Sequence, residues 1–564
     1  MKNKVNKIVI LGGGAAGWFT AGYLKYKNPN IDITLIESKK IGIIGVGEST
    51  IPQLGDFFKE MGIEERDWMS HTNSIYKLGN KFVGWNKEGN RHHVTNHWNC
   101  SKFEEQYFSF SFALPEKHLT TSFYHQLQTK DFFTNSQGRP GVDDKWNDYW
   151  LQLCRDGRKN WWEMSEDMQE QTYLMDMNKA PFDMDDNILI GNWQAKTYHV
   201  DAERFPEVVR DRVALPNGVK HVWGHVKDIV KDNEGYVEKL VLEDGSEWEA
   251  DLFCDATGFN RLLTGTMNNG WHDYDHIFTR DAIVGPVEYK DVYSEFRPYT
   301  QSYAGDEGWT FIISLFNRMG SGYIFDRTEI SPEDAKKKFM KYWEGYKFIK
   351  EPRHITWESG RMKTPWNKNV VGIGMAGAFV EPMEANSLYV AQACIQLVHR
   401  LINRAKDEDA VISPSQIYAY NRNMCQLEDG IADFIAFHFT LSDREDTPFW
   451  RKQKQLGIER NHKEACWNEY KRPTNYIGNG VYPDYMWAML AVYLNKFDDS
   501  VELNTRKELI ENANIMFEYC NKMSKENGKY APHAYDWHRK FLFEGKDYKQ
   551  VLKEALAKVS RNIA

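Results

Sequence analysis

Long hydrophobic runs and paired cysteines are both missing from this sequence of 564 residues. No run reaches the roughly 18 apolar residues that a membrane-spanning helix needs, so we expect no such helix. The seven cysteines are odd in number and never spaced C-x-x-C, which argues against a disulfide framework and a zinc site. The histidines of "RHHVTNHW" have no carboxylate or cysteine at a matching spacing, so we expect no metal there.

An excess of basic charge is also missing. Lysine and arginine number 71 against 80 aspartates and glutamates, which gives a net charge of −9 without a basic stripe. We therefore expect no nucleic-acid partner. The start, "MKNKVNKIVILGGG", lacks the apolar core of a signal peptide, and unpaired cysteines suit a reducing compartment, so we expect a cytoplasmic protein.

The order of elements predicts an α+β fold. "KIVIL" at 7–11, the helical pattern after "GGG" and the strand "IDITLIE" form a β-α-β unit, and residues 226–258 alternate like a β-meander. Because no linker or repeat separates the parts, we expect interleaved domains. We predict a core at 1–400 with insertions at about 66–190 and 270–330, and a helical region at 401–564.

The first glycine-rich turn predicts a dinucleotide site. Gly12, Gly14 and Gly17 match G-x-G-x-x-G between a strand and a helix, with Ala15 and Ala16 inside the motif. Such a turn brings the backbone and a helix N-terminus against a pyrophosphate. Glu37 ends the next strand, where an acid accepts a hydrogen bond from a ribose hydroxyl.

A second glycine-rich turn, "VVGIGMAGAFVEP" at 370–382, favours FAD over NAD, as does "ATG" at 256–258. The second turn also fits G-x-G-x-x-G, so a second nucleotide site is the competing interpretation. A helix follows it and no acid-ended strand does, which favours one bound dinucleotide contacted from both turns.

The chain resembles the flavin-dependent halogenases of the tryptophan-halogenase family. The motifs that carry this resemblance run from residue 7 to about 450: "GGGAAGW", "GVGESTIP" (45–52), "YKLGNKFVGW" (76–85), "YHVDAERF" (198–205), "DATGFNRLL" (255–263), "GWTFIISLFNRMGSGYIF" (308–325), "FVEPMEANSLY" (379–389) and "FIAFHFTLSDREDTPFW" (434–450). So many ordered matches are far more specific than the glycines. The resemblance implies an FAD-monooxygenase-like core.

The resemblance also implies a reaction. A separate flavin reductase delivers FADH2, which with O2 and a bound halide yields hypohalous acid, and this oxidant reaches Lys77 beside an aromatic substrate. Glu384 matches the catalytic glutamate, and Glu381 is interpreted as structural. From the residues by themselves, the preferred interpretation is that Lys77 is a solvated lysine and Glu384 a member of a buried ion pair; the aligned motifs favour the catalytic roles.

Further site residues follow from the resemblance. The backbone N–H groups of Asn386 and Ser387 match the halide site, and a helix N-terminus suits an anion. FAD contacts are expected at Gly47, Glu48, Ser49, Val226, Gly374, Ala376 and Phe379. The substrate pocket is expected at Pro52, Phe110, Trp309 and Phe311.

The sequence departs from the family at several of these positions. In W-x-W-x-I-P, Phe311 replaces the second tryptophan and Ser314 the proline, which keeps a flavin-dependent aromatic hydroxylase open as an alternative. Ala385 replaces a serine after the catalytic glutamate. Asn386 and Ser387 replace Thr-Gly, which leaves the halide preference open. Because bromide and iodide are easier to oxidise than chloride, we favour them.

The expected substrate differs from free tryptophan. The family's C-terminal segment that binds the amino-acid head group is shortened here, and a zwitterion without partners binds poorly. We therefore expect an indole, phenol or aniline. A flavin-binding protein without halogenating activity is a further alternative. The last 60 or so residues read as helices with an apolar stripe, which would fit a homo-oligomer as well as closure of the fold.

Overall fold

The computed structural model of the chain describes residues 1–40, 47–51, 53–86, 107–111, 145–160, 170–189, 197–405, 411–460 and 510–544, and the single positions 482, 490, 494, 503, 505 and 507. Pro52, the histidine-rich 91–98 and the side chain of Phe110 lie outside the described parts. The predictions made for them stay untested.

The β-α-β unit opens a six-stranded sheet in the order β20-β21-β12-β1-β2-β8, parallel except for β20 at its edge. Its strands are β1 (Lys7–Leu11), β2 (Asp32–Glu37), β8 (Lys220–Trp223), β12 (Leu252–Asp255), β20 (Trp366–Asn367) and β21 (Val370–Gly372). The apolar run of β1 is buried because α1 (Ala15–Lys27) packs against the sheet. Both glycine-rich turns therefore leave strands of one sheet.

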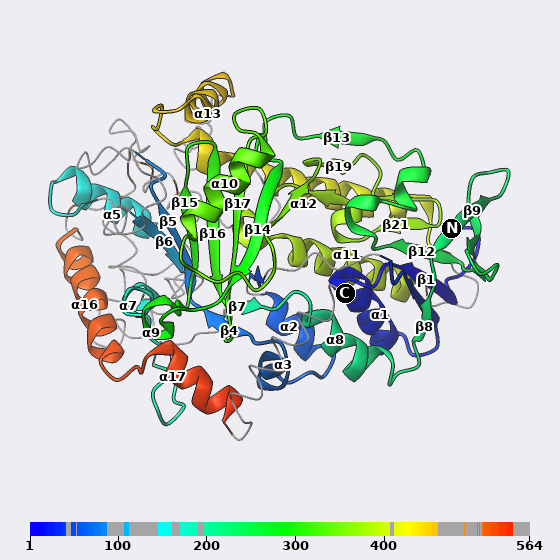
Figure 1. Ribbon diagram of the computed structural model, residues 1–564, viewed down its shortest axis with the longest axis horizontal. Helices are drawn as coiled ribbons and strands as arrows, with labels where there is room; N and C mark the ends of the chain where they lie inside the picture. The colour runs from blue at the N-terminus through cyan, green and yellow to red at the C-terminus, as the bar shows by residue number, and fades with distance from the viewer. Residues whose placement is uncertain are drawn as a thin grey trace.

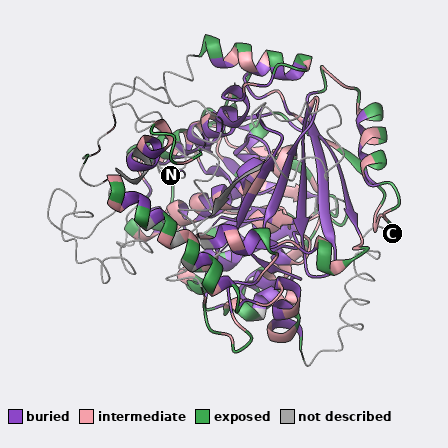
Figure 2. Ribbon diagram, turned by 90° about the vertical axis from the view of Figure 1, so that its left-hand side faces the viewer, coloured by how far each residue is buried: buried purple, intermediate pink, exposed green. Residues whose placement is uncertain are grey.

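A seven-stranded sheet stands beside the first (Figure 1), in the order β18-β14-β17-β16-β15-β5-β6. All its pairs are antiparallel except β5 with β15. The strands are β5 (Gly79–Val83), β6 (Tyr107–Ser111), β14 (Asp281–Val287), β15 (Thr300–Ala304), β16 (Gly308–Ser314), β17 (Met319–Phe325) and β18 (Arg353–Thr356). Its central strands are buried throughout (Figure 2), and α10 (Pro332–Tyr342) packs on β14 and β17.

Three small sheets complete the described strands. β3 (Glu48–Ser49), β7 (Thr197–Val200) and β4 (Ile75–Lys77) form one, and β13 (Trp271–Asp273), β19 (Gly360–Met362) and β22 (Ala378–Phe379) form another. The third contains β9 (Val226–Lys231), β10 (Val237–Leu242) and β11 (Glu247–Glu249), which confirms the predicted meander. The β3-β7-β4 sheet joins the "GVGES" segment to β4, the strand that ends in Lys77.

Helices cover the sheets and join distant parts of the chain. They are α2 (Gln53–Lys59), α3 (Glu65–His71), α5 (Lys145–Arg155), α7 (Glu170–Asp176), α8 (Phe205–Val209), α9 (Val292–Glu295), α11 (Ser387–Arg404), α12 (Pro414–Thr440), α13 (Pro448–Glu459), α16 (Ile510–Gly528) and α17 (Ala534–His538). α16 packs against α5 and α7 (Figure 1), so the C-terminal helices complete the side formed by the first insertion. The predicted mixed α and β fold is confirmed.

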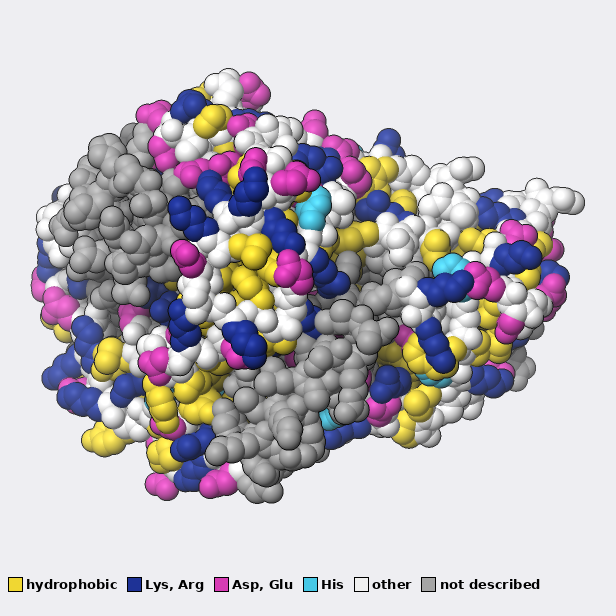
Figure 3. Space-filling view, viewed as in Figure 1, with side chains coloured by type: hydrophobic (Ala, Val, Ile, Leu, Met, Phe, Trp, Pro, Cys, Tyr) yellow, Lys and Arg dark blue, Asp and Glu magenta, His cyan; other side chains and the backbone are white. Residues whose placement is uncertain are grey.

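The described surface mixes both signs of charge. On the face seen in Figure 3, lysine and arginine side chains are interspersed with aspartate and glutamate. Among the described helices, none combines the length and apolarity that crossing a membrane requires. The division into domains at residue 400 stays a prediction.

Candidate active site

Glu384 stands in a strained turn before α11. It lies in the 3-10 turn Met383–Ala385 with a backbone φ of 62°, and Ala385 follows with a φ of 57°. Side chains rarely adopt this left-handed region, and such residues concentrate at functional sites. The turn directs the Glu384 side chain into the interior, and only 5% of the residue is exposed.

Two side chains from distant segments bind the Glu384 carboxylate. Asn80 Nδ2 on β5 donates to Oε2 at 3.2 Å, and His438 Nε2 on α12 lies 3.3 Å from Oε1. His438 Nδ1 lies 2.9 Å from the Phe434 carbonyl, which can only accept, so Nδ1 carries a proton. Nε2 is therefore the ring nitrogen that faces the carboxylate, within ion-pair distance.

Lys77 reaches the same region from the end of β4. It is 1% exposed, and its Nζ donates to the Thr50 carbonyl at 3.3 Å. Burial lowers the pKa of Lys77 from 10.5 to about 7, and the charge of Glu384 opposes this shift. Near neutral pH the side chain therefore holds a substantial fraction of unprotonated amine, which is a nucleophile.

Aromatic rings surround the Glu384–His438 pair. The centroids of Phe82 and Phe434 lie 5.1 and 5.0 Å from that of His438, and the Trp85 centroid lies 6.2 Å away. Tyr482 stacks on Phe434 with centroids 3.9 Å apart. Apolar walls around a few polar groups are typical of sites that bind aromatic molecules.

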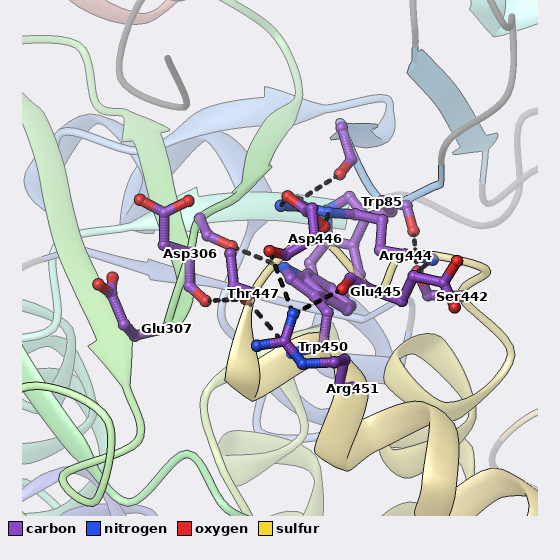
Figure 4. Close-up of polar contacts among 12 residues, drawn as sticks. Trp85, Asp306, Glu307, Ser442, Arg444, Glu445, Asp446, Thr447, Trp450 and Arg451 are labelled. Carbon is purple, nitrogen blue, oxygen red and sulfur yellow. Dashed lines mark hydrogen bonds and ion pairs between the residues drawn. The ribbon is translucent and has the colours of Figure 1, made fainter. Parts of the chain in front are cut away.

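The segment after α12 is hydrogen-bonded to the residues around Trp85, one of these aromatic side chains (Figure 4). Arg444 forms two contacts with Asp446, Nε to Oδ1 at 3.0 Å and Nη2 to Oδ2 at 2.8 Å, and donates from Nη1 to the Gly84 carbonyl at 2.9 Å. Ser442 Oγ donates to the Trp85 carbonyl at 2.6 Å. The end of α12, which carries His438, is thereby fastened to the end of β5.

The start of α13 is bonded to the turn between β15 and β16 (Figure 4). Thr447 Oγ1 donates to the Asp306 carbonyl at 2.7 Å, and Trp450 Nε1 donates to the Gly305 carbonyl at 2.8 Å. These bonds hold β16, which carries Trp309, against Trp85, with ring centroids 6.3 Å apart. Most of the quoted "LSDREDTPFW" motif therefore serves to position the pocket.

The first glycine-rich turn has the shape that a dinucleotide requires. A Cβ at Gly12 would lie 2.3 Å from the Ala256 carbonyl oxygen, and one at Gly17 would lie 1.8 Å from the Gly12 oxygen, so neither position accepts a side chain. A Cβ at Gly14 would meet nothing within 4 Å, which leaves open space at the N-terminus of α1. This is the cradle expected for a pyrophosphate. Ala15 and Ala16 begin α1 beside it.

Glu37 ends β2 beside this turn. Its carboxylate occupies the place that a Cβ of Gly13 would take, and Oε1 lies 2.6 Å from His221 Nε2 on β8. Burial raises the pKa of Glu37, and the charge of His221 opposes that shift. Glu37 is the residue predicted to contact a ribose, and one of its carboxylate oxygens already contacts His221.

The second glycine-rich turn lies against the first. A Cβ at Gly374, whose φ is 59°, would sit 3.4 Å from the Ala16 Cβ. Among the described residues, β22 follows this turn and no second β-α-β unit does, which fits one dinucleotide contacted from both turns. Ala376 and Phe379 are buried beside it, and Val226 starts β9 and packs on a core that β10 shares with β1, β2 and β12.

The "GVGES" segment is tied to the Lys77 region. Loss of hydration raises the pKa of Glu48 to about 7. Ser49 Oγ lies 3.0 Å from Thr300 Oγ1, which lies 2.9 Å from His199 Nε2. Gly47, with a φ of 113°, packs on the turn after β16. A chain of buried polar contacts thus runs from this segment to β7, which pairs with β4.

Asn386 and Ser387 begin α11 directly after the strained turn. Ala385 is left-handed and Asn386 right-handed, with φ −78° and ψ −25°. Successive backbone N–H groups in such a left-right sequence converge on one point and favour an anion, as does a helix N-terminus. The residues predicted for halide therefore have suitable backbone geometry.

The altered W-x-W-x-I-P motif occupies β16. Trp309 and Phe311 point to the same side with ring centroids 6.2 Å apart, and both are buried. The Phe311 ring fits over Gly322 of β17, where a Cβ would lie 2.5 Å from Phe311 Cε1. Ser314 Oγ accepts from the Arg297 N–H at 3.0 Å, a bond that the family's proline could not make.

Glu381, interpreted as structural, is buried and bonded to the Thr279 hydroxyl. Burial raises its pKa to about 8, so it is mostly neutral at pH 7. A neutral carboxyl group is a weaker proton acceptor than a carboxylate. Its surroundings therefore fit the structural interpretation.

Sequence reasoning missed three residues that line the site: Asn80, His438 and Tyr482. Asn80 and His438 lie inside quoted family motifs, and that position is the only signal that could have found them. His438 reads as an ordinary core residue of a helix. Within the described residues, no group of three or more His, Cys, Asp and Glu side chains could hold a metal.

Comparisons with known proteins identify relatives of this chain. The family model for tryptophan halogenase matches residues 7–495. Tryptophan 6-halogenase ThaL of Streptomyces albogriseolus is 30% identical over 475 residues, 82% of each chain. Tryptophan 7-halogenase RebH of Lentzea aerocolonigenes is 30% identical over 467 residues, 81% of this chain and 80% of its own.

Solved structures share the fold. A tryptophan halogenase from Shewanella frigidimarina NCIMB 400 superposes with a TM-score of 0.80 at 23% identity, over 97% of this chain and 99% of its own. BrvH, a flavin-dependent halogenase from Brevundimonas sp. BAL3, gives a TM-score of 0.75 at 23% identity, over 95% and 99%. The chain belongs to the tryptophan halogenase family of flavin-dependent, oxidoreductase-type halogenating enzymes.

Proposed function

We propose that this enzyme halogenates an indole, phenol or aniline rather than free tryptophan, and that Lys77 and Glu384 carry the transfer. The observation that supports this most is the burial of both groups in one electrostatically coupled site. They come from segments more than 300 residues apart, and the Glu384 charge acts on the Lys77 ammonium. Burying two such groups costs free energy, so a catalytic role accounts for an arrangement that stability does not favour.

FADH2, supplied by a separate flavin reductase, provides with O2 the oxidising equivalents that convert halide to hypohalous acid. The open space at Gly14 and the adjacent second glycine-rich turn support FAD as the dinucleotide. Glu37 would meet its ribose.

The Lys77 amine receives the oxidant. As an ammonium it donates a hydrogen bond to the oxygen of hypohalous acid. As a free amine it attacks the halogen, and a haloamine and hydroxide form, with the lysine proton converting hydroxide to water. An aromatic carbon then takes the halogen without its bonding electrons. These electrons stay on the hypohalous oxygen, which leaves as water with the ammonium proton, or on the Lys77 nitrogen, which takes up a proton and becomes the amine again. The pKa of about 7 makes both forms available near neutral pH.

Glu384 removes the proton from the cationic arene that results. Asn80 orients its carboxylate, and His438 Nε2, 3.3 Å from Oε1, is placed to take the proton onward. Loss of that proton restores aromaticity, and the halogenated product leaves. The strained turn keeps Glu384 pointed into the site during this step.

The surroundings support a compact aromatic acceptor. Phe82, Trp85, Phe434 and Tyr482 offer stacking surfaces, which favour rings of varied shape. We also propose that Asn386 and Ser387 bind the halide, with bromide or iodide favoured. A cytoplasmic location and a homo-oligomer stay predictions.

Mass spectrometry of product tests the function. Protein with FAD, NADH, a flavin reductase and catalase would be offered mixed indoles, phenols, anilines and tryptophan, with chloride, bromide or iodide in separate tubes. We expect a halogen mass shift that Lys77→Ala and Glu384→Gln abolish and that the control Lys81→Ala, at a lysine ion-paired with Asp176, retains. A shift of one oxygen would instead identify a hydroxylase. A halogenated tryptophan as the main product would contradict the proposed substrate class.

A further inference from the structure

Asn386 has a side chain that is bonded at both ends. Its Nδ2 donates to the Met383 carbonyl at 3.0 Å, and its Oδ1 accepts from the Tyr482 hydroxyl. Asn386 is 5% exposed and Tyr482 8%, so both bonds lie in the interior. Rotating the carboxamide would leave buried polar atoms unpaired, which costs about 1–3 kcal/mol. The amide N–H2 group is therefore held toward Met383, within its own turn.

Tyr482 is itself held in place. Its ring stacks on Phe434 with an interplanar angle of 19°, one helical turn before His438 on α12. Burial raises the pKa of Tyr482 well above its ordinary value, and the charge of Glu384 adds to the rise. The hydroxyl consequently stays protonated and remains a donor at every pH at which the enzyme works. Tyr482 connects the acid of the site with the first turn of α11.

We propose that Tyr482 determines halide preference by keeping the Asn386 amide turned away from the anion at the N-terminus of α11. This inference rests on the proposed function, in which that position binds halide. With the amide held, the anion meets backbone N–H groups but no side-chain donor from Asn386. Chloride gives up more hydration free energy than bromide or iodide, so a site with few donors favours the larger halides.

Removing the Tyr482 hydroxyl frees Oδ1 of Asn386. The carboxamide can then turn its N–H2 toward the halide, and the small, strongly hydrated chloride gains most from the new donor. We expect Tyr482→Phe to shift relative affinity toward chloride by about three- to tenfold, the effect of one hydrogen bond. Asn386→Leu has no donor to offer, so Tyr482→Phe combined with Asn386→Leu should not shift toward chloride.

The test uses the FAD-bound protein and two readouts. Chlorine nuclear magnetic resonance line widths, with bromide as the displacing ion, give the ratio of chloride to bromide affinity without turnover. Turnover of indole in equal chloride and bromide gives the ratio of chlorinated to brominated product. Tyr323→Phe is the matched control. Tyr323 on β17 is also a buried tyrosine, and its hydroxyl bonds to Glu307, just before β16.

The outcomes test the role of Tyr482 and the proposed halogenating function separately. A chloride shift in Tyr482→Phe that is absent from Tyr323→Phe and from the double variant supports the role of Tyr482. An unchanged affinity ratio, or no displaceable chloride in the unmodified protein, overturns it. A shifted ratio with no halogenated product of any kind supports the inference about Tyr482 and counts against the proposed function.

Discussion

His438 Nε2 lies 3.3 Å from Glu384 Oε1, and neither side chain is exposed to solvent. The other ring nitrogen of His438 donates to a helix carbonyl, so Nε2 is the nitrogen that faces the carboxylate. A histidine in this position can accept a proton that a catalytic carboxylate has taken up, which returns the acid to its carboxylate form. We propose that Glu384 and His438 form a proton relay in this way.

Replacing His438 should therefore slow product formation. We expect His438→Phe to lower the rate by about 10- to 100-fold and to alter its pH profile, because the ring shape stays while the proton partner is lost. His438→Gln should lose less, since its amide can still donate to Glu384. Rates over pH 6–9 for both variants, beside His354→Gln at the partly exposed pair with Asp281, check this. An unchanged rate and profile in His438→Phe would contradict the relay.

Lys77 should make stability depend on pH. Its folded pKa of about 7 lies below the ordinary 10.5. Below pH 7 both folded and unfolded chains carry the ammonium, so the cost of burying it is fully present. Above 10.5 neither chain carries it, and the cost disappears. Stability therefore rises with pH between about 7 and 10.5.

Lys77→Met removes that cost. We expect its gain in melting temperature to be larger at pH 6 than at pH 9. Lys81→Met, at a half-buried lysine on β5 that pairs with Asp176, should show little difference between the two. Differential scanning fluorimetry at both pH values measures this. Equal gains at the two pH values would show that Lys77 is not buried as an ammonium at pH 6.

Side chains introduced at Gly14 and at Gly17 should have different effects, the first on FAD binding and the second on folding stability. A Cβ at Gly14 meets open space, so Gly14→Val should fold with a melting temperature close to that of the unmodified protein and lose FAD affinity by tenfold or more. A Cβ at Gly17 would collide with the Gly12 oxygen, so Gly17→Ala should destabilise the apoprotein itself. Calorimetric FAD titration and thermal melts without FAD separate the two effects. Full FAD binding by Gly14→Val would place the dinucleotide elsewhere.

The Phe311 ring should need a residue without a side chain at position 322. Gly322→Ala places a Cβ 2.5 Å from Phe311 and 2.9 Å from Val284, which overpacks a buried sheet and should cost about 1–3 kcal/mol of stability. Phe311→Leu shortens the opposing side chain and should recover part of that loss in the double variant. Thermal melts of both single variants and the double variant give the coupling. Strict additivity would mean that the ring does not depend on Gly322.

The sequence determined the parts that depend on local pattern. Glycine spacing after a strand predicted the cradle at Gly12, Gly14 and Gly17, because backbone shape there admits no Cβ at two of the three positions. Alternation predicted the meander, since polar and apolar residues of a strand face opposite sides. The ordered motifs identified the family and pointed to Lys77 and Glu384.

Only the tertiary structure decided which side chains surround those two residues. Asn80 and Glu384 are 304 positions apart, and Tyr482 lies 96 positions beyond Asn386. His438 reads as one more core residue of a helix until α12 brings it against Glu384. Local sequence constrains the backbone of a segment, but hydrogen-bond partners depend on which segments the sheets and helices pack together. The sequence by itself therefore pointed to the acid and the lysine as candidate catalytic residues, and long-range packing placed the asparagine, the histidine and the tyrosine around them.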